Sequence, residues 1–349
     1  KSGMYILCAR CNNNVWFIPL VIKNNSNKNK ILVLSNVNTW NAYEYWAGYN
    51  NDMISAYKWE TNFSNNLKYR ENDKFKSYKM SFNRPSILIS KDVQKFIDNN
   101  INSYVTYSHL VYSELWMYKF LDNNSIEYDL INDIDLNNNE GVNENYKLFI
   151  IHSHPEYWTE NALINLNKMT QDGTNLAYFG GNGFYWKTTY NNNVMEVRKD
   201  GSNHDQDNKK GGLWIDLQLP NSYLNGPELF GVWFNKSKFN KITLWPFNKT
   251  KNNYLLDNIE DEFGDDSLSS VKDDDGSLSC WEVDDVISTY NKKYENNIIA
   301  SAKNGADMLY IEEDNYKIFS GSTILWTSGL LVDDNIKKLT LNVINSFSK

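Results

Sequence analysis

Two side chains near the middle of the chain have the chemistry of a hydrolytic or metal site. His154 and Glu156 lie in residues 152–158, a segment with two of the four histidines of the protein. An imidazole can move a proton near neutral pH, and a carboxylate can bind a metal ion or act as a general base. The segment therefore predicts a reaction centre. The alternative is that His152 ends a strand and packs, while Glu156 only caps a following helix.

Gly180-Gly181-Asn182 is a second candidate segment. A glycine pair lets the backbone turn sharply and approach a ligand closely, and the amide of Asn182 can orient a carbonyl or stabilise an oxyanion. The segment lacks the glycine spacing of a dinucleotide site and that of a phosphate-binding loop. We therefore predict no nucleotide.

Aromatic residues accompany these segments and a third one, residues 38–43. Side chains of this kind commonly line ligand clefts, but each cluster taken singly is as often part of a core. If the three segments meet in space, the aromatic residues would form the walls of one cleft. They are Trp40, Tyr43, Tyr45, Trp46, Tyr157, Trp158, Phe184, Tyr185 and Trp186.

Short apolar strands must position all three segments. Residues 31–35, 148–151 and 175–179 are continuous apolar runs, and residues 109–122 and 159–170 have helical spacing. Strands that alternate with helices predict an α/β fold with a doubly wound, mostly parallel sheet. Ligands of such sheets bind beyond the carboxyl ends of the strands, which is where the three segments fall.

The remaining pattern predicts two units. Residues 4–10 and 15–22 read as a β-hairpin, so residues 1–24 are expected to be the end of an upstream β-sandwich-like domain and a linker. Residues 25–349 form the α/β domain, with a β-rich insertion at about 187–260. Because the first residue is Lys1 and not Met, we expect the sequence to be part of a longer chain or assembly.

Composition and motifs exclude several functions. The net charge of −8 and the scattered lysines argue against nucleic acid, and no apolar run could span a membrane. A single C-x-x-C at Cys8 and Cys11 is too little for structural zinc. An acidic string from Asp273 to Glu282 lacks the first ligand of a calcium loop, so it predicts a surface loop. No nucleophile elbow is present, which disfavours covalent catalysis.

The order of four motifs resembles one known family. Residues 39–43, 81–85, 154–158 and 180–186, together with the tail 317–347, resemble the carboxyl-terminal domain of the N,N-dimethylformamidase large subunit and its uncharacterised relatives. The resemblance covers nearly the whole chain. It implies a class I glutamine amidotransferase-like α/β fold preceded by a β domain.

The resemblance also implies site residues. In the formamidases an iron ion is held by two tyrosinates and one glutamate, and Tyr43 and Glu156 match one of each. His154 and Asn182 match positions beside the ligands, and Arg198 or Lys199 matches a basic residue. The position of the second tyrosine is held here by Phe82, which cannot bind iron. Tyr45 and Tyr78 are possible substitutes.

The sequence leaves three functions open. The first is hydrolysis of a small amide or related C–N bond at a metal, with Tyr43 and Glu156 as ligands and His154 and Asn182 as catalytic groups. The second is binding of a small molecule, such as a glycan, by Trp158 and Trp186 without turnover. The third is a structural module that kept the fold and lost the site. The sequence does not indicate a compartment.

Overall fold

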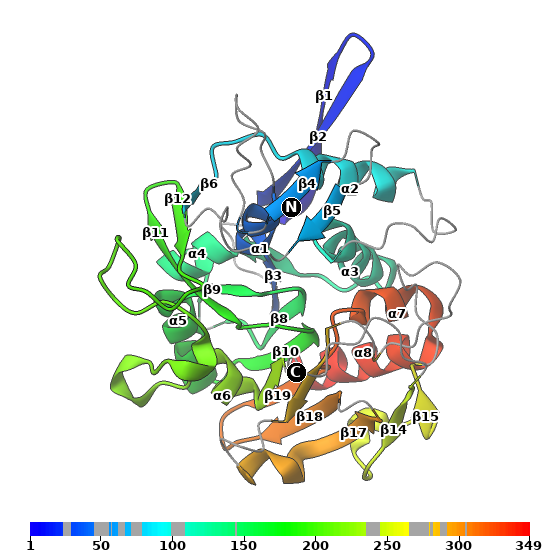
Figure 1. Ribbon diagram of the computed structural model, residues 1–349. Helices are drawn as coiled ribbons and strands as arrows, with labels where there is room; N and C mark the ends of the chain where they lie inside the picture. Colours follow the sequence, from blue (N-terminus) through cyan, green and yellow to red (C-terminus); the bar gives the residue numbers. More distant parts are fainter. Residues whose placement is uncertain are drawn as a thin grey trace.

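The protein folds around one large mixed sheet (Figure 1). The computed structural model describes residues 1–23, 29–44, 56, 58–61, 67–70, 79–98, 109–143, 145–234, 245–264, 279, 282–286, 292–303 and 306–349. Within these ranges the chain is a mixed α/β protein. Its nine-stranded sheet has the strand order β15-β14-β17-β18-β19-β10-β8-β3-β7.

The helices and strands have the following bounds. The helices are α1 (Val37–Tyr43), α2 (Ile87–Ile97), α3 (Val111–Asn123), α4 (Asp133–Asn138), α5 (Glu160–Gln171), α6 (Gly226–Phe230), α7 (Trp326–Val332) and α8 (Asp334–Phe347). The large sheet contains β3 (Ile31–Ser35), β7 (Asp129–Asn132), β8 (Leu148–Ser153), β10 (Asn175–Gly180), β14 (Phe247–Lys249), β15 (Glu262–Phe263), β17 (Ile298–Ala302), β18 (Asp307–Glu312) and β19 (Lys317–Ser320). The other strands are β1 (Gly3–Cys11), β2 (Asn14–Ile22), β4 (Lys58–Thr61), β5 (Leu67–Arg70), β6 (Lys79–Ser81), β9 (Tyr157–Thr159), β11 (Trp186–Asn191), β12 (Val194–Val197), β13 (Val232–Phe234) and β16 (Asp284–Val286).

One half of the large sheet is parallel, as the apolar runs predict. Strands β7, β3, β8, β10 and β19 pair in parallel, and every residue of β3 and β8 is buried. Helix α5 begins where predicted, because the Thr159 hydroxyl accepts a hydrogen bond from the Ala162 N–H at 3.2 Å. The expected strands at 31–35, 148–151 and 175–179 are therefore confirmed, as are the helices that flank them.

The other half of the sheet is antiparallel. Strands β19, β18, β17, β14 and β15 pair successively in antiparallel register. The connections from β17 to β18 and from β18 to β19 span only residues 303–306 and 313–316. A parallel pair needs a crossover of about a dozen residues or more, so connections this short leave only the antiparallel arrangement. The prediction of a mostly parallel sheet is wrong for this half.

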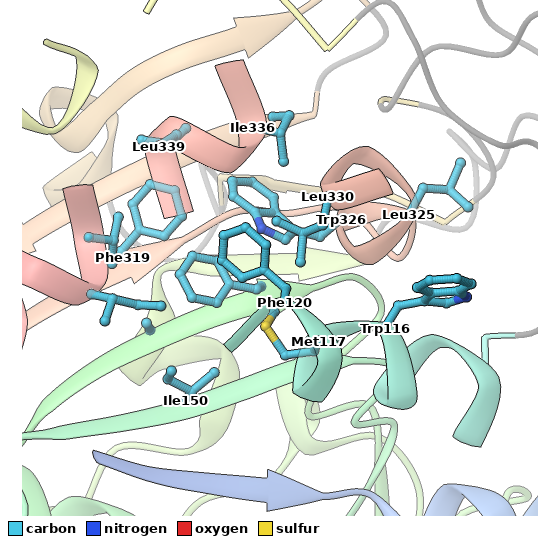
Figure 2. Close-up of a cluster of buried hydrophobic side chains, with 14 of the residues drawn as sticks. Trp116, Met117, Phe120, Ile150, Phe319, Leu325, Trp326, Leu330, Ile336 and Leu339 are labelled. Carbon is cyan, nitrogen blue, oxygen red and sulfur yellow. The ribbon is translucent and has the colours of Figure 1, made fainter. Parts of the chain in front are cut away.

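Apolar side chains cover both faces of the large sheet. On one face, residues of α3, α7 and α8 pack over Ile150 and Phe319, as Figure 2 shows. Trp326 lies at the centre of this cluster and donates its indole N–H to the Thr340 hydroxyl at 3.0 Å. On the opposite face, α5 packs Leu163 and Leu166 against the sheet. Successive strand residues thus point to opposite cores, which explains why these strands are apolar throughout.

A smaller sheet stands at the carboxyl end of the parallel strands. Its order is β6-β12-β11-β9, and β9 follows directly on the 152–156 segment. One face contributes Tyr157, Met195 and Val197 to a cluster that includes Tyr43. Residues 187–260, which we expected to be a β-rich insertion, include β12 of this small sheet and β14 of the large one.

The first 22 residues form the predicted hairpin. Strands β1 and β2 pair over their whole length, and the turn places Asn12 at φ 53°. One face packs on the body, where the Phe17 N–H donates to the Ser90 hydroxyl at 2.9 Å. The other face leaves Leu7 and Leu20 exposed, and the tip extends away from the body (Figure 1). The upstream β domain itself stays a prediction.

Candidate functional site

Three loops meet at the carboxyl ends of β3, β8 and β10. The Asn36 side chain donates to the His152 carbonyl at 2.8 Å, and the Glu156 N–H donates to the Thr39 hydroxyl at 3.1 Å. The Gly181 N–H donates to the Ser153 carbonyl at 3.3 Å. These bonds tie the loop after β8 to both neighbours. The cleft-forming segments expected from the sequence are thus side by side.

His154 lies at the centre of this meeting point. Its Nε2 is 3.1 Å from Oε2 of Glu282 and 3.5 Å from Oε2 of Glu156. The side-chain amide nitrogen of Asn182 is 3.4 Å from the same ring nitrogen, and the Tyr43 ring centroid is 5.7 Å from the His154 ring centroid. The four residues selected from the sequence, Tyr43, His154, Glu156 and Asn182, are therefore brought together.

The surroundings of His154 favour its protonated form. Burial alone lowers the pKa of an imidazole, but the carboxylates of Glu282, Glu156 and Asp284 raise it, and the pKa of His154 is raised overall. The ring is 1% exposed, so these carboxylates act through a poorly hydrated medium. An imidazole held in this way can receive a proton and return it.

His109 is a site residue that the sequence analysis did not select. Its ring centroid lies 4.8 Å from that of Tyr43 and 4.8 Å from that of His154. Burial of the ring, and then the neighbouring His154, lower the pKa of His109 well below its ordinary value. The residue lies two positions before the first residue of α3. The one available signal was that it is among only four histidines in the chain.

Glu282 is a second site residue that the sequence pattern does not indicate. The acidic string predicts a surface loop, but only 16% of the Glu282 side chain is exposed and its carboxylate contacts His154. That prediction was wrong for Glu282, and Asp273 and Asp275 lie outside the described residues. Backbone contacts position it, since the Ile324 N–H donates to the Glu282 carbonyl at 3.1 Å. No local sequence pattern predicts this contact between Glu282 and His154, because the two residues lie in distant segments of the chain.

Asp284 and Tyr178 hold the turn that carries Asn182. Asp284 accepts the Asn182 N–H at 2.9 Å and the Tyr178 hydroxyl at 2.8 Å. The same hydroxyl accepts the Gly183 N–H at 2.8 Å. Burial raises the pKa of Asp284 to about 7. Asn182 itself has φ 49°, in the left-handed region that asparagine tolerates better than most residues.

Gly181 allows the two halves of the site to touch. A Cβ atom at this position would lie 2.3 Å from the Ile324 nitrogen and 2.5 Å from the Glu282 carbonyl oxygen. Because both are backbone atoms, no side-chain rotation could relieve the clash. The predicted close approach of the glycine pair is therefore real, but the partner is the protein's own chain.

A buried carboxylate fixes the helix that carries Tyr43. Glu114 of α3 is 1% exposed, and burial raises its pKa to about 7. It anchors the junction between β3 and α1, and through Asn36 it also holds the end of β8. Its hydrogen-bond donors are the hydroxyls of Ser35 and Tyr118, the backbone and side-chain N–H groups of Asn36, and the Trp40 indole.

The described residues supply two of the three iron ligands that the resemblance implies. Tyr43 and Glu156 are present at the site, whereas Phe82 packs its ring against Tyr190, with centroids 6.0 Å apart. The Tyr190 hydroxyl donates a hydrogen bond to the Asn38 side-chain oxygen, so it is already paired within the protein. Tyr45 and Tyr78 lie outside the described residues. In the part of the chain that the structure describes, no three His, Cys, Asp or Glu side chains are grouped to hold a metal ion.

Four further residues were expected to bind a ligand. Trp158 is 1% exposed and packs against Phe184, so it belongs to the core and not to a cleft wall. A binding role for Trp158 stays a prediction, although its side chain is enclosed by other residues of the core in this structure. Trp186 is half-buried beneath the Lys199 ammonium, which lies 5.1 Å from the Trp186 ring.

Arg198 and Lys199 point to opposite faces of the small sheet. Lys199 lies 5.3 Å from the Tyr157 ring, on the face that includes Tyr43. Arg198 binds Glu196 at 2.6 Å and Asp205 at 2.7 Å on the other face. Of the two alternatives for a basic residue, the structure thus brings Lys199 closer to the site.

Sequence comparisons with known proteins identify one matching family and two curated relatives. A family model described as "N,N-dimethylformamidase beta subunit-like, C-terminal" matches residues 1–338. Two curated relatives, the N,N-dimethylformamidase beta subunits of Alcaligenes sp and Paracoccus aminophilus, are each 24% identical over 68% of this chain. The chain spans 37% of the length of each relative.

Two solved structures align with the chain at low similarity. A cytoplasmic protein of Salmonella typhimurium LT2 superposes with a TM-score of 0.43 and 9% identity, over 91% of this chain and 99% of that one. A β-galactosidase from Bacillus circulans sp. alkalophilus gives a TM-score of 0.39 and 10% identity, over 68% of this chain and 27% of that one. Among the helices that the structure describes, none is long and apolar enough to cross a membrane.

Proposed function

Because the chain belongs to the N,N-dimethylformamidase beta subunit-like, C-terminal family, we propose that it hydrolyses a small amide or a related C–N bond. The observation that carries this proposal is the contact of one buried imidazole, His154, with Glu156, Glu282 and Asn182. A hydrolytic site needs a group that takes a proton from water and later returns it to the leaving nitrogen. His154 has the environment for that work.

The proposed reaction uses these side chains in sequence. His154 in its neutral form accepts a proton from water, whose oxygen attacks the amide carbon, and the Glu282 carboxylate stabilises the imidazolium that results. The imidazolium then gives the proton to the leaving nitrogen as the C–N bond breaks. Asn182, whose amide touches the same imidazole, orients the reacting groups. Since the base must be neutral, activity should rise with pH through the pKa of His154.

Metal dependence is a further part of the proposal. Tyr43 and Glu156 would hold the ion, and a third ligand would come from elsewhere in the chain. When bound, such an ion supplies Lewis-acid polarisation of the amide carbonyl. The residues of this chain would then bind the amide, keep it near His154 and exclude bulk water.

We also propose a fold family for the parallel half of the sheet and a larger assembly for the chain. Parallel strands with helices on both faces support a class I glutamine amidotransferase-like arrangement for the parallel half of the sheet. The relatives are named as beta subunits and are longer than this chain. We therefore propose that the chain works within a longer polypeptide or a larger assembly.

Amide turnover and metal content together test this function. Purified protein is loaded with iron, analysed for bound metal and assayed with small amides, alongside the variants Glu156→Ala and His154→Gln. We expect stoichiometric metal that Glu156→Ala loses, and turnover that both variants lose. His204→Gln is the matched control, because His204 is equally buried but lies on the far face of the small sheet. Absence of both metal and turnover in the iron-loaded protein would exclude a metal-dependent amidase.

A further inference from the structure

The site contains a buried hydrogen-bond acceptor that no protein donor satisfies. Oδ1 of Asn182 is enclosed and meets no donor among the described residues, although the residue is only 3% exposed. Its orientation is set by its neighbour, since the amide nitrogen donates to Oε2 of Glu282 at 3.1 Å. Turning the amide over would place two oxygens in contact. The unsatisfied atom is therefore the oxygen.

Glu282 offers a second acceptor at the edge of the site. Its Oε2 takes both the His154 and the Asn182 contacts, whereas its Oε1 meets no donor within the described ranges. Glu282, Tyr43 and His109 are the partly exposed members of the group, and His154, Glu156 and Asn182 are buried. Of the two acceptor residues, Glu282 is therefore the nearer to solvent and Asn182 the more deeply enclosed.

The charge of the site agrees with these acceptors. Glu156 and Glu282 place two carboxylates around one imidazole, and Asp284 lies behind them. The guanidinium of Arg198 is bound to other carboxylates, and the Lys199 ammonium lies over aromatic rings. A ligand that donates hydrogen bonds and carries no negative charge is complementary to this arrangement.

We propose that the substrates are amides that keep at least one N–H, namely primary and N-monoalkyl amides. This inference rests on the proposed hydrolysis and names its substrate class. A fully substituted amide has no N–H and would leave the Asn182 and Glu282 oxygens unsatisfied. A site built around hydrogen-bond partners discriminates strongly against analogues that lack them, so we expect a preference of about tenfold or more. The relatives are named for an amide that has no N–H. Because Asn182 matches a position of that family, the proposal separates this chain from them through the Glu282 acceptor.

The experiment compares formamide, N-methylformamide and N,N-dimethylformamide on the full chain. Their kcat/KM values are measured, and their equilibrium affinities are measured in parallel by calorimetry. We expect N,N-dimethylformamide to be the poorest of the three in both measurements. If it binds and reacts as well as formamide, the proposed substrate class is overturned.

The two measurements separate this inference from the proposed function. Ranked binding without turnover of any amide would support the preference for N–H groups and remove the hydrolase. Turnover of the amides at equal rates and affinities would support the hydrolase and overturn the preference for N–H groups. If none of the three amides binds, the inference is also overturned.

A pair of conservative variants identifies the atoms responsible. Glu282→Gln can keep an oxygen toward Asn182 while presenting an N–H in place of Oε1, so it should reduce the disadvantage of N,N-dimethylformamide. Glu262→Gln makes the same chemical change on the exposed edge strand β15 and should leave the ranking intact. An unchanged ranking in Glu282→Gln would contradict the role of Oε1.

Discussion

Nε2 of His154 lies 3.1 Å from Oε2 of Glu282, although the two residues come from loops far apart in the chain. The first follows a parallel strand of the large sheet, and the second precedes β16, which pairs with β13 in a separate two-stranded sheet. This contact joins the two halves of the candidate site. It makes the proton affinity of His154 depend on a residue contributed by another part of the fold.

The pKa of His154 should respond to its carboxylates in a fixed order. Burial opposes the charge, while Glu282, Glu156 and Asp284 favour it with decreasing strength. Glu282→Gln should therefore lower the pKa of His154 most, followed by Glu156→Gln and Asp284→Asn. Ring proton chemical shifts followed against pH in chelator-treated protein give the values. A larger effect from Asp284→Asn would contradict the geometry.

Gly181→Ala should separate the Asn182 turn from Glu282. The added methyl group meets backbone atoms at 2.3 and 2.5 Å, so the strand segments must move apart. We expect a loss of about 1–3 kcal/mol in the free energy of unfolding, together with a lower His154 pKa. Gly201→Asn is the control, since nothing lies within 4 Å of a Cβ there and asparagine tolerates its φ of 76°. Wild-type behaviour of Gly181→Ala would rule out the close approach.

Glu114→Ala should be far more harmful than Glu114→Gln. Oε1 of Glu114 accepts three N–H groups, which cannot reverse their role, and Oε2 accepts two hydroxyls, which can. Glutamine can keep its oxygen toward the N–H groups and donate to the hydroxyls. Alanine leaves the donors without an acceptor, for a loss of about 3–5 kcal/mol in urea unfolding. Equal losses in the two variants would show that charge, and not hydrogen bonding, is what matters at this position.

His152 should make the fold sensitive to acid. Burial lowers the pKa of His152 to about 3, whereas the unfolded chain has an ordinary value near 6.5. The unfolded state therefore binds more protons between these two values, so this residue reduces stability as pH falls below 6.5. By pH 4 the loss should reach about 3 kcal/mol, and His152→Gln should not show it. Urea unfolding from pH 4 to pH 8 measures the difference, and parallel profiles would contradict it.

Much of the fold was predictable because its cause is local. A strand buried on both faces is apolar throughout, as in residues 31–35 and 148–151. The start of α5 is predicted by Thr159, which caps the helix. The antiparallel half of the sheet was also within reach. Its connections at residues 303–306 and 313–316 are too short for a parallel crossover, a constraint that outweighs the continuing α/β pattern.

The site was predictable only in part. Parallel strands bring their carboxyl ends to one edge, so the meeting of Tyr43, His154 and Asn182 followed from topology. His109 and Glu282 did not, because nothing within a few residues of either one encodes its partner. The burial of Trp158 was equally hidden, since a strand that follows a loop can turn either face to the core.

The sequence by itself determined which segments are strands and helices, and that the loop containing His154 and Glu156 stands at a strand end. Those properties depend on periodicity and turn chemistry over a few residues. Only the tertiary structure decided that Glu282 reaches the imidazole, that Arg198 is turned away and that Phe82 packs on Tyr190. These outcomes depend on how distant segments pack, and that packing sets the hydrogen bonds and charges that each side chain meets.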